Sequence, residues 1–350
     1  MKLWAKRAAF LLAVVFLVLT VVNASWLAPA PTGVVKLIAH RGLAQEFDRT
    51  GVGRDTCTAE LIERPVHEYL ENTARGARKA GLLGAHMIEI DIAPTADGKI
   101  AVFHDWTLDC RTDGSGPVRS ATMAELKALD IGHGYTADGG KTYPLRGSGV
   151  GQLPELAELL GELPRTTRVM YNFKSDDAAE ADLLAAALAQ AGRDPVKSRD
   201  AFYGHPAPVA RIRELHPQAW SWSPEAAKSC TQDYVLTGWS GAVPSSCRNG
   251  TLIVPINRQW MFWGWPNRLI ARMESVGARV IVTGPHVSGE PNTGLTLPEQ
   301  VEDVPADFNG YLWVEDAWTI APALYPGSDN RTQAERDAAR AGLARRRMRD

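Results

Sequence analysis

The 350-residue sequence lacks several patterns that mark common classes of protein. Neither GxGxxG nor GxxxxGK[ST] follows any predicted strand, which argues against the nucleotide-binding folds that use such loops. No CxxC and no closely spaced Cys/His pair occurs, which argues against structural zinc. Positive charge is not in excess, because the formal net charge is −2 and the pI is about 6.5. The chain therefore has no overall basic character that would favour nucleic acid as a partner.

The one long hydrophobic run lies at the N-terminus. Basic residues at positions 2, 6 and 7 precede an apolar stretch over 8–22, and small residues follow at 23–25. This order is typical of a cleaved signal peptide, and with Trp26 and Leu27 the stretch is also nearly long enough for a retained transmembrane anchor. Both alternatives predict that residues 1–28 direct the rest of the chain to the periplasmic or extracellular face. Residues 29–34 are then a Pro/Gly-containing spacer.

Cysteine is scarce, with only four residues in the chain. An even number in an exported protein permits two disulfides, in three connectivities. We expect Cys57–Cys110, which would tie an early loop to the segment just after His104, and Cys230–Cys247, which would close a short local loop. The alternative is that these residues are small buried hydrophobes.

Concentrated positive charge is confined to the C-terminal run Arg345-Arg346-Arg347-Met348-Arg349. We expect residues 326–350 to form a solvated or frayed charged tail, with contact to anionic lipid as the alternative.

Between these ends, short apolar runs alternate with helical patterns. Strands are expected at 34–39, 86–92, 99–103, 168–174, 201–203, 252–256, 280–283 and 311–314, with helices near 73–80, 122–129, 153–160, 178–191, 207–215 and 267–276. About eight strands alternating with helices predict a (β/α)8 TIM barrel of the α/β class over residues 35–325.

Four polar clusters stand at or near the ends of these apolar runs. They are His40-Arg41-Gly42, Glu89-Ile90-Asp91, His104-Asp105 and Asn172-Phe173-Lys174. Groups that follow the carboxyl ends of barrel strands converge on one face of the barrel, however far apart they are in sequence.

The acidic cluster predicts a metal site. Glu89 and Asp91 are two residues apart on a strand, so their carboxylates point to the same side. With the carbonyl oxygen of Asn172 they would supply oxygen ligands suited to Mg²⁺ or Ca²⁺. The alternative is an ordinary alternation of acidic and aliphatic residues at the surface.

The basic residues predict phosphodiester chemistry. His40 and His104 can transfer protons near neutral pH, one from the nucleophile and one to the leaving alkoxide. Arg41 and Lys174 can bind phosphate oxygens, or alternatively form ion pairs with Glu89 or Asp91. The combination indicates a phosphodiesterase.

An aromatic segment, Trp260-Met261-Phe262-Trp263-Gly264-Trp265, stands outside these clusters. We expect core packing or a strand-to-helix corner, with a lid or a membrane-resting lip near the site as the alternative.

Taken together, these motifs resemble the glycerophosphodiester phosphodiesterase family. The resemblance rests on His40-Arg41-Gly42, Glu71-Asn72-Thr73, Glu89-Ile90-Asp91, Thr95-Ala96-Asp97-Gly98, His104-Asp105, Leu108 to Arg111 with Thr112 and Gly114, and Asn172-Phe173-Lys174. It is clear over about residues 36–175 and weaker to about 320. It implies a TIM barrel and hydrolysis of glycerophosphodiesters to an alcohol and glycerol 3-phosphate. It also implies proton transfer by His40 and His104, metal binding by Glu89 and Asp91, and phosphate contact by Arg41 and Lys174.

Three departures from the family pattern stand out. Asn172 replaces a third acidic metal ligand, which should weaken metal binding, although an amide oxygen is a normal ligand for a hard cation. The segment between His40 and Glu71 is longer than usual and contains a cysteine. Leu70 stands where proline is familiar.

Two further functions remain open from the sequence. One is a phospholipase-D-like or phosphatidylinositol-lyase-like enzyme on lipid substrates, favoured by the aromatic segment and the N-terminal hydrophobic run. The other is a catalytically weak barrel that binds a phosphate-bearing ligand, supported only by Asn172. For the leading function we expect a small-molecule glycerophosphodiester as substrate, with possible membrane association through the N-terminus and no nucleic acid as partner.

Overall fold

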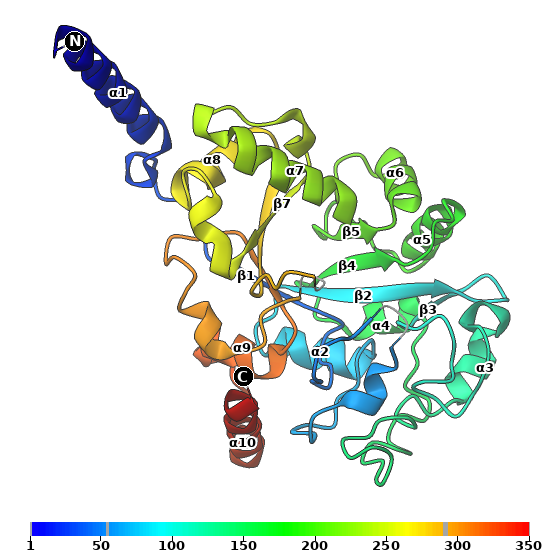
Figure 1. Cartoon of the computed structure of the whole chain (residues 1–350). Helices are drawn as coiled ribbons and strands as arrows, with labels where there is room; N and C mark the ends of the chain where they lie inside the picture. Colours follow the sequence, from blue (N-terminus) through cyan, green and yellow to red (C-terminus); the bar gives the residue numbers. More distant parts are fainter. Residues whose placement is uncertain (1, 54–55, 290–292, 350) are drawn as a thin grey trace.

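The computed structural model describes residues 2–53, 56–289 and 293–349. Its centre is a nearly closed barrel of eight parallel strands with helices outside (Figure 1). The hydrogen-bonded order is β6-β5-β4-β2-β1-β9-β8-β7, so neighbours in the barrel follow one another along the chain. The barrel strands are β1 (Lys36–Ala39), β2 (Met87–Pro94), β4 (Arg168–Phe173), β5 (Ala201–Gly204), β6 (Trp220–Trp222), β7 (Thr251–Pro255), β8 (Arg279–Thr283) and β9 (Tyr311–Val314). This confirms the predicted TIM barrel.

Two strands differ from the sequence-based expectation. The run at 99–103 forms β3 (Ile100–Val102), which pairs antiparallel with β2 and lies outside the barrel. The eighth barrel strand is instead β6, which was not predicted because it has only three residues and no apolar run. Across the seam between β6 and β7, the Trp220 indole Nε1 donates to Thr251 Oγ1 at 2.9 Å.

The helices on the outside cover the apolar face of the sheet. They are α2 (Ala74–Leu82), α3 (Met123–Ala128), α4 (Leu156–Glu162), α5 (Ala179–Gln190), α6 (Pro206–Leu215), α7 (Pro224–Thr237), α8 (Asn267–Ser275) and α9 (Ala317–Leu324). The alternation on β2 shows how the two faces divide, because Ile88 and Ile90 pack in the main core. Glu89 and Asp91 point to the other side, toward the barrel interior.

The N-terminal helix α1 (Lys2–Asn23) projects away from the barrel (Figure 1). It is long and apolar enough to cross a membrane, a test that a signal sequence also passes. Its last turn contacts the barrel: Asn23 Nδ2 donates to the Trp239 carbonyl, and Arg272 donates to the carbonyl of Val22.

The C-terminal residues are not a solvated tail. They form α10 (Gln333–Arg349), which packs on the barrel through Ala339 and Leu343. Arg346 is only 4% exposed and forms ion pairs with Glu63 and Asp316. The expectation of a solvated segment was wrong here, because one arginine of the basic run is buried and pairs with the buried Asp316 and the half-buried Glu63.

Both predicted disulfides are present, Cys57–Cys110 and Cys230–Cys247. The first connects the long segment after β1 to the segment that follows β3. The second joins α7 to the short turn before β7.

Candidate active site

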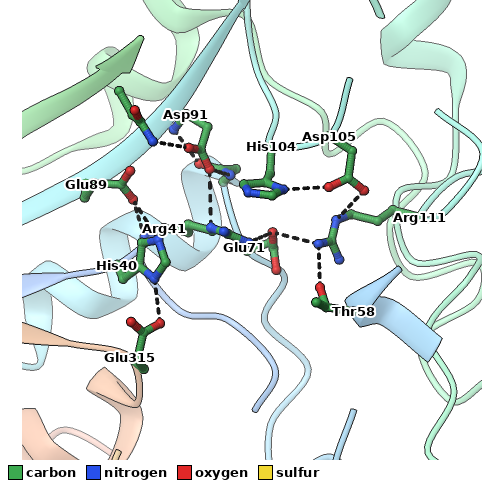
Figure 2. Close-up of polar contacts among 12 residues, drawn as sticks. His40, Arg41, Thr58, Glu71, Glu89, Asp91, His104, Asp105, Arg111 and Glu315 are labelled. Carbon is green, nitrogen blue, oxygen red and sulfur yellow. Dashed lines mark hydrogen bonds and ion pairs between the residues drawn. The ribbon is translucent and has the colours of Figure 1, made fainter. Parts of the chain in front are cut away.

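The four polar clusters converge at one end of the barrel. Figure 2 shows three of them side by side, and Asn172 and Lys174 of the fourth contact Asp91. His40 follows β1, the acidic pair lies in the second half of β2, and Asn172 with Lys174 stands at the end of β4. His104 arrives differently, because it follows β3 and is carried back toward the site by the antiparallel hairpin. The sequence thus predicted that the clusters converge. It did not predict that His104 follows an antiparallel strand outside the barrel.

Glu89 and Asp91 are both fully buried, and polar groups surround them. Glu89 accepts hydrogen bonds from the backbone N–H of Arg41 at 2.9 Å and from the Tyr203 hydroxyl at 2.6 Å. Burial and the adjacent charge of Asp91 raise the pKa of Glu89 above its ordinary value. The surroundings of Glu89 therefore disfavour its ionised form.

Asp91 receives a denser set of donors. Its carboxylate accepts from the amides of Asn72 at 2.9 Å and Asn172 at 2.8 Å. Lys174 Nζ and Arg41 Nε each lie 3.3 Å from it. Burial would raise the pKa of Asp91, but Lys174 and the other positive groups hold it far below its ordinary value. Asp91 is therefore ionised at any physiological pH.

Arg41 and Lys174 thus form ion pairs with Asp91, which was the alternative to phosphate binding. Arg41 also donates to Glu71 at 2.9 Å, so its guanidinium is held between two carboxylates. Its backbone has φ 57°, and Gly42 has φ 77°. A Cβ on Gly42 would lie 3.0 Å from backbone atoms of Ala77, so only glycine allows this turn to pack against α2.

His40 has a carboxylate partner from the far end of the chain. Its Nδ1 lies 2.5 Å from Glu315 Oε2, and its Nε2 lies 3.9 Å from Glu89 Oε2. Burial by itself would lower the pKa of His40, but the charges of Glu315 and Glu89 and the hydrogen bond with Glu315 together outweigh it, and the pKa is raised. The same contact helps hold the pKa of Glu315 well below its usual range, against the effect of burial.

His104 is held by a chain of charged groups (Figure 2). Its Nδ1 lies 2.6 Å from Asp105 Oδ1, and Arg111 Nε lies 3.0 Å from the other oxygen of Asp105. Arg111 also lies 3.5 Å from Glu71, which connects the chain back to Arg41. Burial and the positive charge of Arg41 lower the pKa of His104 to about 4. At neutral pH this imidazole is uncharged, with Nε2 as the nitrogen not engaged by Asp105.

A pocket of about 980 Å³ opens beside these groups. His40, Asn172, Lys174 and Glu315 form part of its polar wall. Its other wall is largely apolar and includes Trp222, Ile253, Phe262, Met261 and Leu236. The pocket is large enough for a small phosphodiester with additional groups.

The residues at the end of β2 fit a hard divalent cation with few protein ligands. Among the described residues, no three His, Cys, Asp or Glu side chains are placed to hold an ion together. Glu89 and Asp91 offer two carboxylates, and Asn172 would contribute Oδ1 if its amide turned from its present hydrogen bond to Asp91. Two carboxylates with water and substrate oxygens are a common ligand set for Mg²⁺. A cation beside Glu89 would stabilise the ionised carboxylate, which burial and Asp91 disfavour.

Every predicted site residue therefore lies in one constellation, while their chemical roles stay predictions. Three contributors were not singled out from the sequence: Glu315, Tyr203 and Arg111. Glu315 directly follows β9, so the strand-end rule that found His40 could have found it. Tyr203 lies within β5, and Arg111 lies in a loop beside Cys110, where no periodicity marks a role.

The comparisons with known proteins agree with this geometry. The glycerophosphoryl diester phosphodiesterase family matches residues 40–223. A glycerophosphodiester phosphodiesterase of Caldanaerobacter subterraneus subsp. tengcongensis is 38% identical over 92 residues, 26% of this chain and 35% of that protein. One of Bacillus subtilis is 34% identical over 110 residues, 31% of this chain and 36% of that protein. The aligned part thus spans about a third of the length of these curated relatives.

Solved structures show the same fold at low identity. A glycerophosphoryl diester phosphodiesterase domain from Mycobacterium tuberculosis aligns with TM-score 0.59 and 16% identity, over 84% of this chain and 100% of that one. A glycerophosphodiester phosphodiesterase from Agrobacterium tumefaciens aligns with TM-score 0.53 and 19% identity, over 82% and 99%. The barrel, the converging clusters and the match over more than half of the chain lead to one conclusion. The chain belongs to the glycerophosphoryl diester phosphodiesterase family.

Proposed function

We propose that this protein is a metal-dependent phosphodiesterase that hydrolyses glycerophosphodiesters to an alcohol and glycerol 3-phosphate. One observation carries the proposal: His40 and His104, each paired with its own carboxylate, meet at the buried acidic pair of β2 beside Arg41 and Lys174. Family membership supports the reaction class.

The two imidazoles would carry the protons. In hydrolysis, water forms a new bond to phosphorus, the bond from phosphorus to the alcohol oxygen breaks, and one proton moves from the water to the departing alkoxide. Each imidazole has Nδ1 engaged by a carboxylate, Glu315 or Asp105, which leaves Nε2 to exchange the proton. We assign His40 and His104 to these transfers.

The charged side chains would bind the phosphate. Arg41 can donate two parallel hydrogen bonds and Lys174 provides a compact positive charge. Both form ion pairs with Asp91 in the structure. Mg²⁺ or Ca²⁺, held by Glu89, Asp91 and Asn172, would neutralise charge on the phosphate oxygens. If a cation bound the carboxylate of Asp91, Arg41 and Lys174 would no longer be needed to neutralise it. Their N–H groups would then be free to donate hydrogen bonds to the phosphate oxygens of the substrate.

The test is turnover of several glycerophosphodiesters by the full-length protein in detergent, with and without chelator. We expect the chelator to stop the reaction, and ³¹P NMR to show glycerol 3-phosphate. A cyclic phosphate would instead indicate a phosphatidylinositol-lyase-like reaction. A folded, metal-loaded protein without turnover would support the phosphate-binding barrel.

A second function, on lipid substrates, is favoured by the apolar wall of the pocket. Leu236 lines this pocket and is 71% exposed. The aromatic segment lies between β7 and α8, as the expectation of a strand-to-helix corner has it. Trp260 is 83% exposed and so is not packed in the core, whereas Phe262 is buried. Trp263 donates its indole N–H to the Val235 carbonyl and so lies against the helix that lines the pocket. This apolar wall could hold the hydrocarbon chain of a lysophospholipid.

The N-terminal helix would bring such a surface near a bilayer. Trp239 and Trp26 are exposed beside the last turn of α1, where an aromatic side chain suits a membrane interface. We therefore place the barrel on the exported side, secreted or anchored by α1, as the two disulfides also favour. Comparing turnover of lysophosphatidylcholine with glycerophosphocholine tests the lipid function. A Leu236→Asp variant should turn over lysophosphatidylcholine more slowly while its turnover of glycerophosphocholine stays unchanged. An equal loss of turnover on both substrates would refute the lipid function.

A further inference from the structure

A second cavity, of about 490 Å³, lies at the opposite end of the barrel. Its lining includes the first residues of five strands: Lys36 of β1, Arg168 of β4, Trp220 of β6, Arg279 of β8 and Tyr311 of β9. The candidate active site lies at the carboxyl ends of the strands, so the two cavities are on opposite faces. Interior side chains such as Met87, Met170 and Ile281 fill the barrel between them. None of the groups assigned to hydrolysis lines this second cavity.

The cavity has more positive than negative charge. Lys36, Arg168, Arg199 and Arg279 line it, against Asp200 and Glu274. Asp200 is already neutralised, because Arg193 donates to both of its oxygens at 2.7 and 2.8 Å. Among the residues that line the cavity, Glu274 is thus the remaining negative charge against four positive side chains.

These cations have only neutral hydrogen-bond partners. Lys36 donates to the carbonyl oxygens of Val34 and Asn309. Arg168 Nη1 donates to the Tyr311 hydroxyl at 3.2 Å. In the part of the chain that the structure describes, no carboxylate lies within ion-pair distance of any of the four.

The clustered charges repel one another. Burial and the nearby charge of Arg168 lower the pKa of Lys36. The pKa of His86 is also lowered, mainly by burial and then by the positive charges of Arg168 and Lys36. Its Nδ1 is buried without a hydrogen-bond partner among the described residues. An anion in the cavity would relieve this repulsion most at Lys36 and Arg168, because these two are partly buried and partly buried charges interact more strongly than exposed ones.

The wall beside the cations is aromatic and apolar. The Trp220 and Tyr311 rings are 4.9 Å apart between centroids, and Ile270 and Met273 line the same cavity. Guanidinium groups can donate two parallel hydrogen bonds to a phosphate, and the rings offer a surface to an attached organic group.

We infer that this cavity is a second anion site, which binds the phosphate group of a phosphorylated organic molecule or of an anionic lipid headgroup. Arg168 and Arg279 would bind the phosphate oxygens, with Trp220 and Tyr311 against the organic part. The site is independent of the proposed hydrolysis, because it shares no residue with the catalytic pocket.

Isothermal titration of the full-length protein in detergent tests the site. Inorganic pyrophosphate is one probe, and dihexanoyl phosphatidic acid, as a soluble lipid headgroup, is the other. The Lys174→Ala background reduces binding in the catalytic pocket. In that background we expect Arg168→Gln and Arg279→Gln each to weaken binding by at least about tenfold, the effect of losing one charge-assisted hydrogen bond. Arg165→Gln, on the exposed loop before β4, is the matched control and should bind as its parent does.

Arg279 is exposed, so its substitution should leave the fold intact even if Arg168→Gln does not. The probe that binds more tightly identifies the source of the phosphate group. No binding of either probe in the Lys174→Ala background would overturn the inference, as would equal binding by Arg279→Gln and Arg165→Gln.

Discussion

Nδ1 of His40 and Oε2 of Glu315 lie 2.5 Å apart although 275 positions separate the two residues in sequence. The contact joins the first barrel strand to the last, because β1 and β9 are hydrogen-bonded neighbours. It also sets the ionisation of one of the two imidazoles in the site.

Replacing Glu315 with Gln should lower the pKa of His40, because only the weaker effect of Glu89 would then oppose burial. The raised pKa of His40 stabilises the fold fully below pH 6.5, and this contribution declines as the pH rises toward the folded-state value. The depressed pKa of Glu315 stabilises it fully above pH 4.5, and this contribution declines as the pH falls. The pair should therefore contribute most between pH 4.5 and 6.5.

Urea unfolding of Glu315→Gln across this range is the measurement. We expect a loss of about 1–3 kcal/mol between those pH values, with a smaller difference on either side. Glu162→Gln, an exposed carboxylate on the last turn of α4, is the control and should show no such profile. A loss independent of pH would show that the contact is not an ion pair.

His40→Ala and His104→Ala should each lower kcat by at least about 10²-fold, the low end of the contribution of a general acid or base. Both residues lie beyond strand ends, so circular dichroism should show an intact fold. Tm should fall in His40→Ala, because Glu315 loses its partner in the ion pair. His205→Ala, an exposed histidine at the start of α6, is the control. Near-normal kcat in either site variant would remove that histidine from the proton transfers.

Asn172→Asp should tighten binding of Mg²⁺ or Ca²⁺. Without metal, the variant loses the hydrogen bond from Asn172 to Asp91, and the new carboxylate repels that of Asp91. The free energy of unfolding should therefore fall by about 1–3 kcal/mol. Adding the cation should restore Tm, with a half-saturating concentration at least about tenfold lower than for the native protein.

Asn172→Ala is the matched control for the lost hydrogen bond and should gain no metal affinity. Glu89→Ala should remove most metal binding and turnover. If Asn172→Asp and the native protein respond to metal alike, Asn172 is not a ligand.

The two disulfides should differ in their effect on activity. Cys230–Cys247 spans 17 positions, so replacing both cysteines with Ala should cost about 3 kcal/mol by loop entropy, without changing kcat. Cys57–Cys110 spans 53 positions and is adjacent to Arg111, which holds Asp105 against His104. Removing it should cost about 4 kcal/mol and also lower kcat. Unfolding and turnover measured on both double variants check this, and equal kcat in the two would contradict it.

Strand assignment shows where sequence patterns were insufficient. Ile100–Val102 and Trp220–Trp222 are both three residues long. The first has an apolar run and was taken for a barrel strand, whereas the second has Ser221 between two tryptophans and was not predicted. Only long-range pairing separates them, because β3 returns antiparallel on β2 while β6 continues the parallel ladder from β5.

The sequence by itself determined the barrel class and the four polar clusters of the candidate site, and it favoured the two disulfide pairs that the structure contains. Strand periodicity and the position of polar residues at strand ends are local properties, and the barrel brings such ends together by its symmetry. Only the tertiary structure decided the partners: Glu315 for His40, Arg111 for Asp105, and Asp91 for both Arg41 and Lys174. These pairs join residues that are far apart in sequence or come from irregular loops, so their electrostatic balance depends on distances that no local pattern contains.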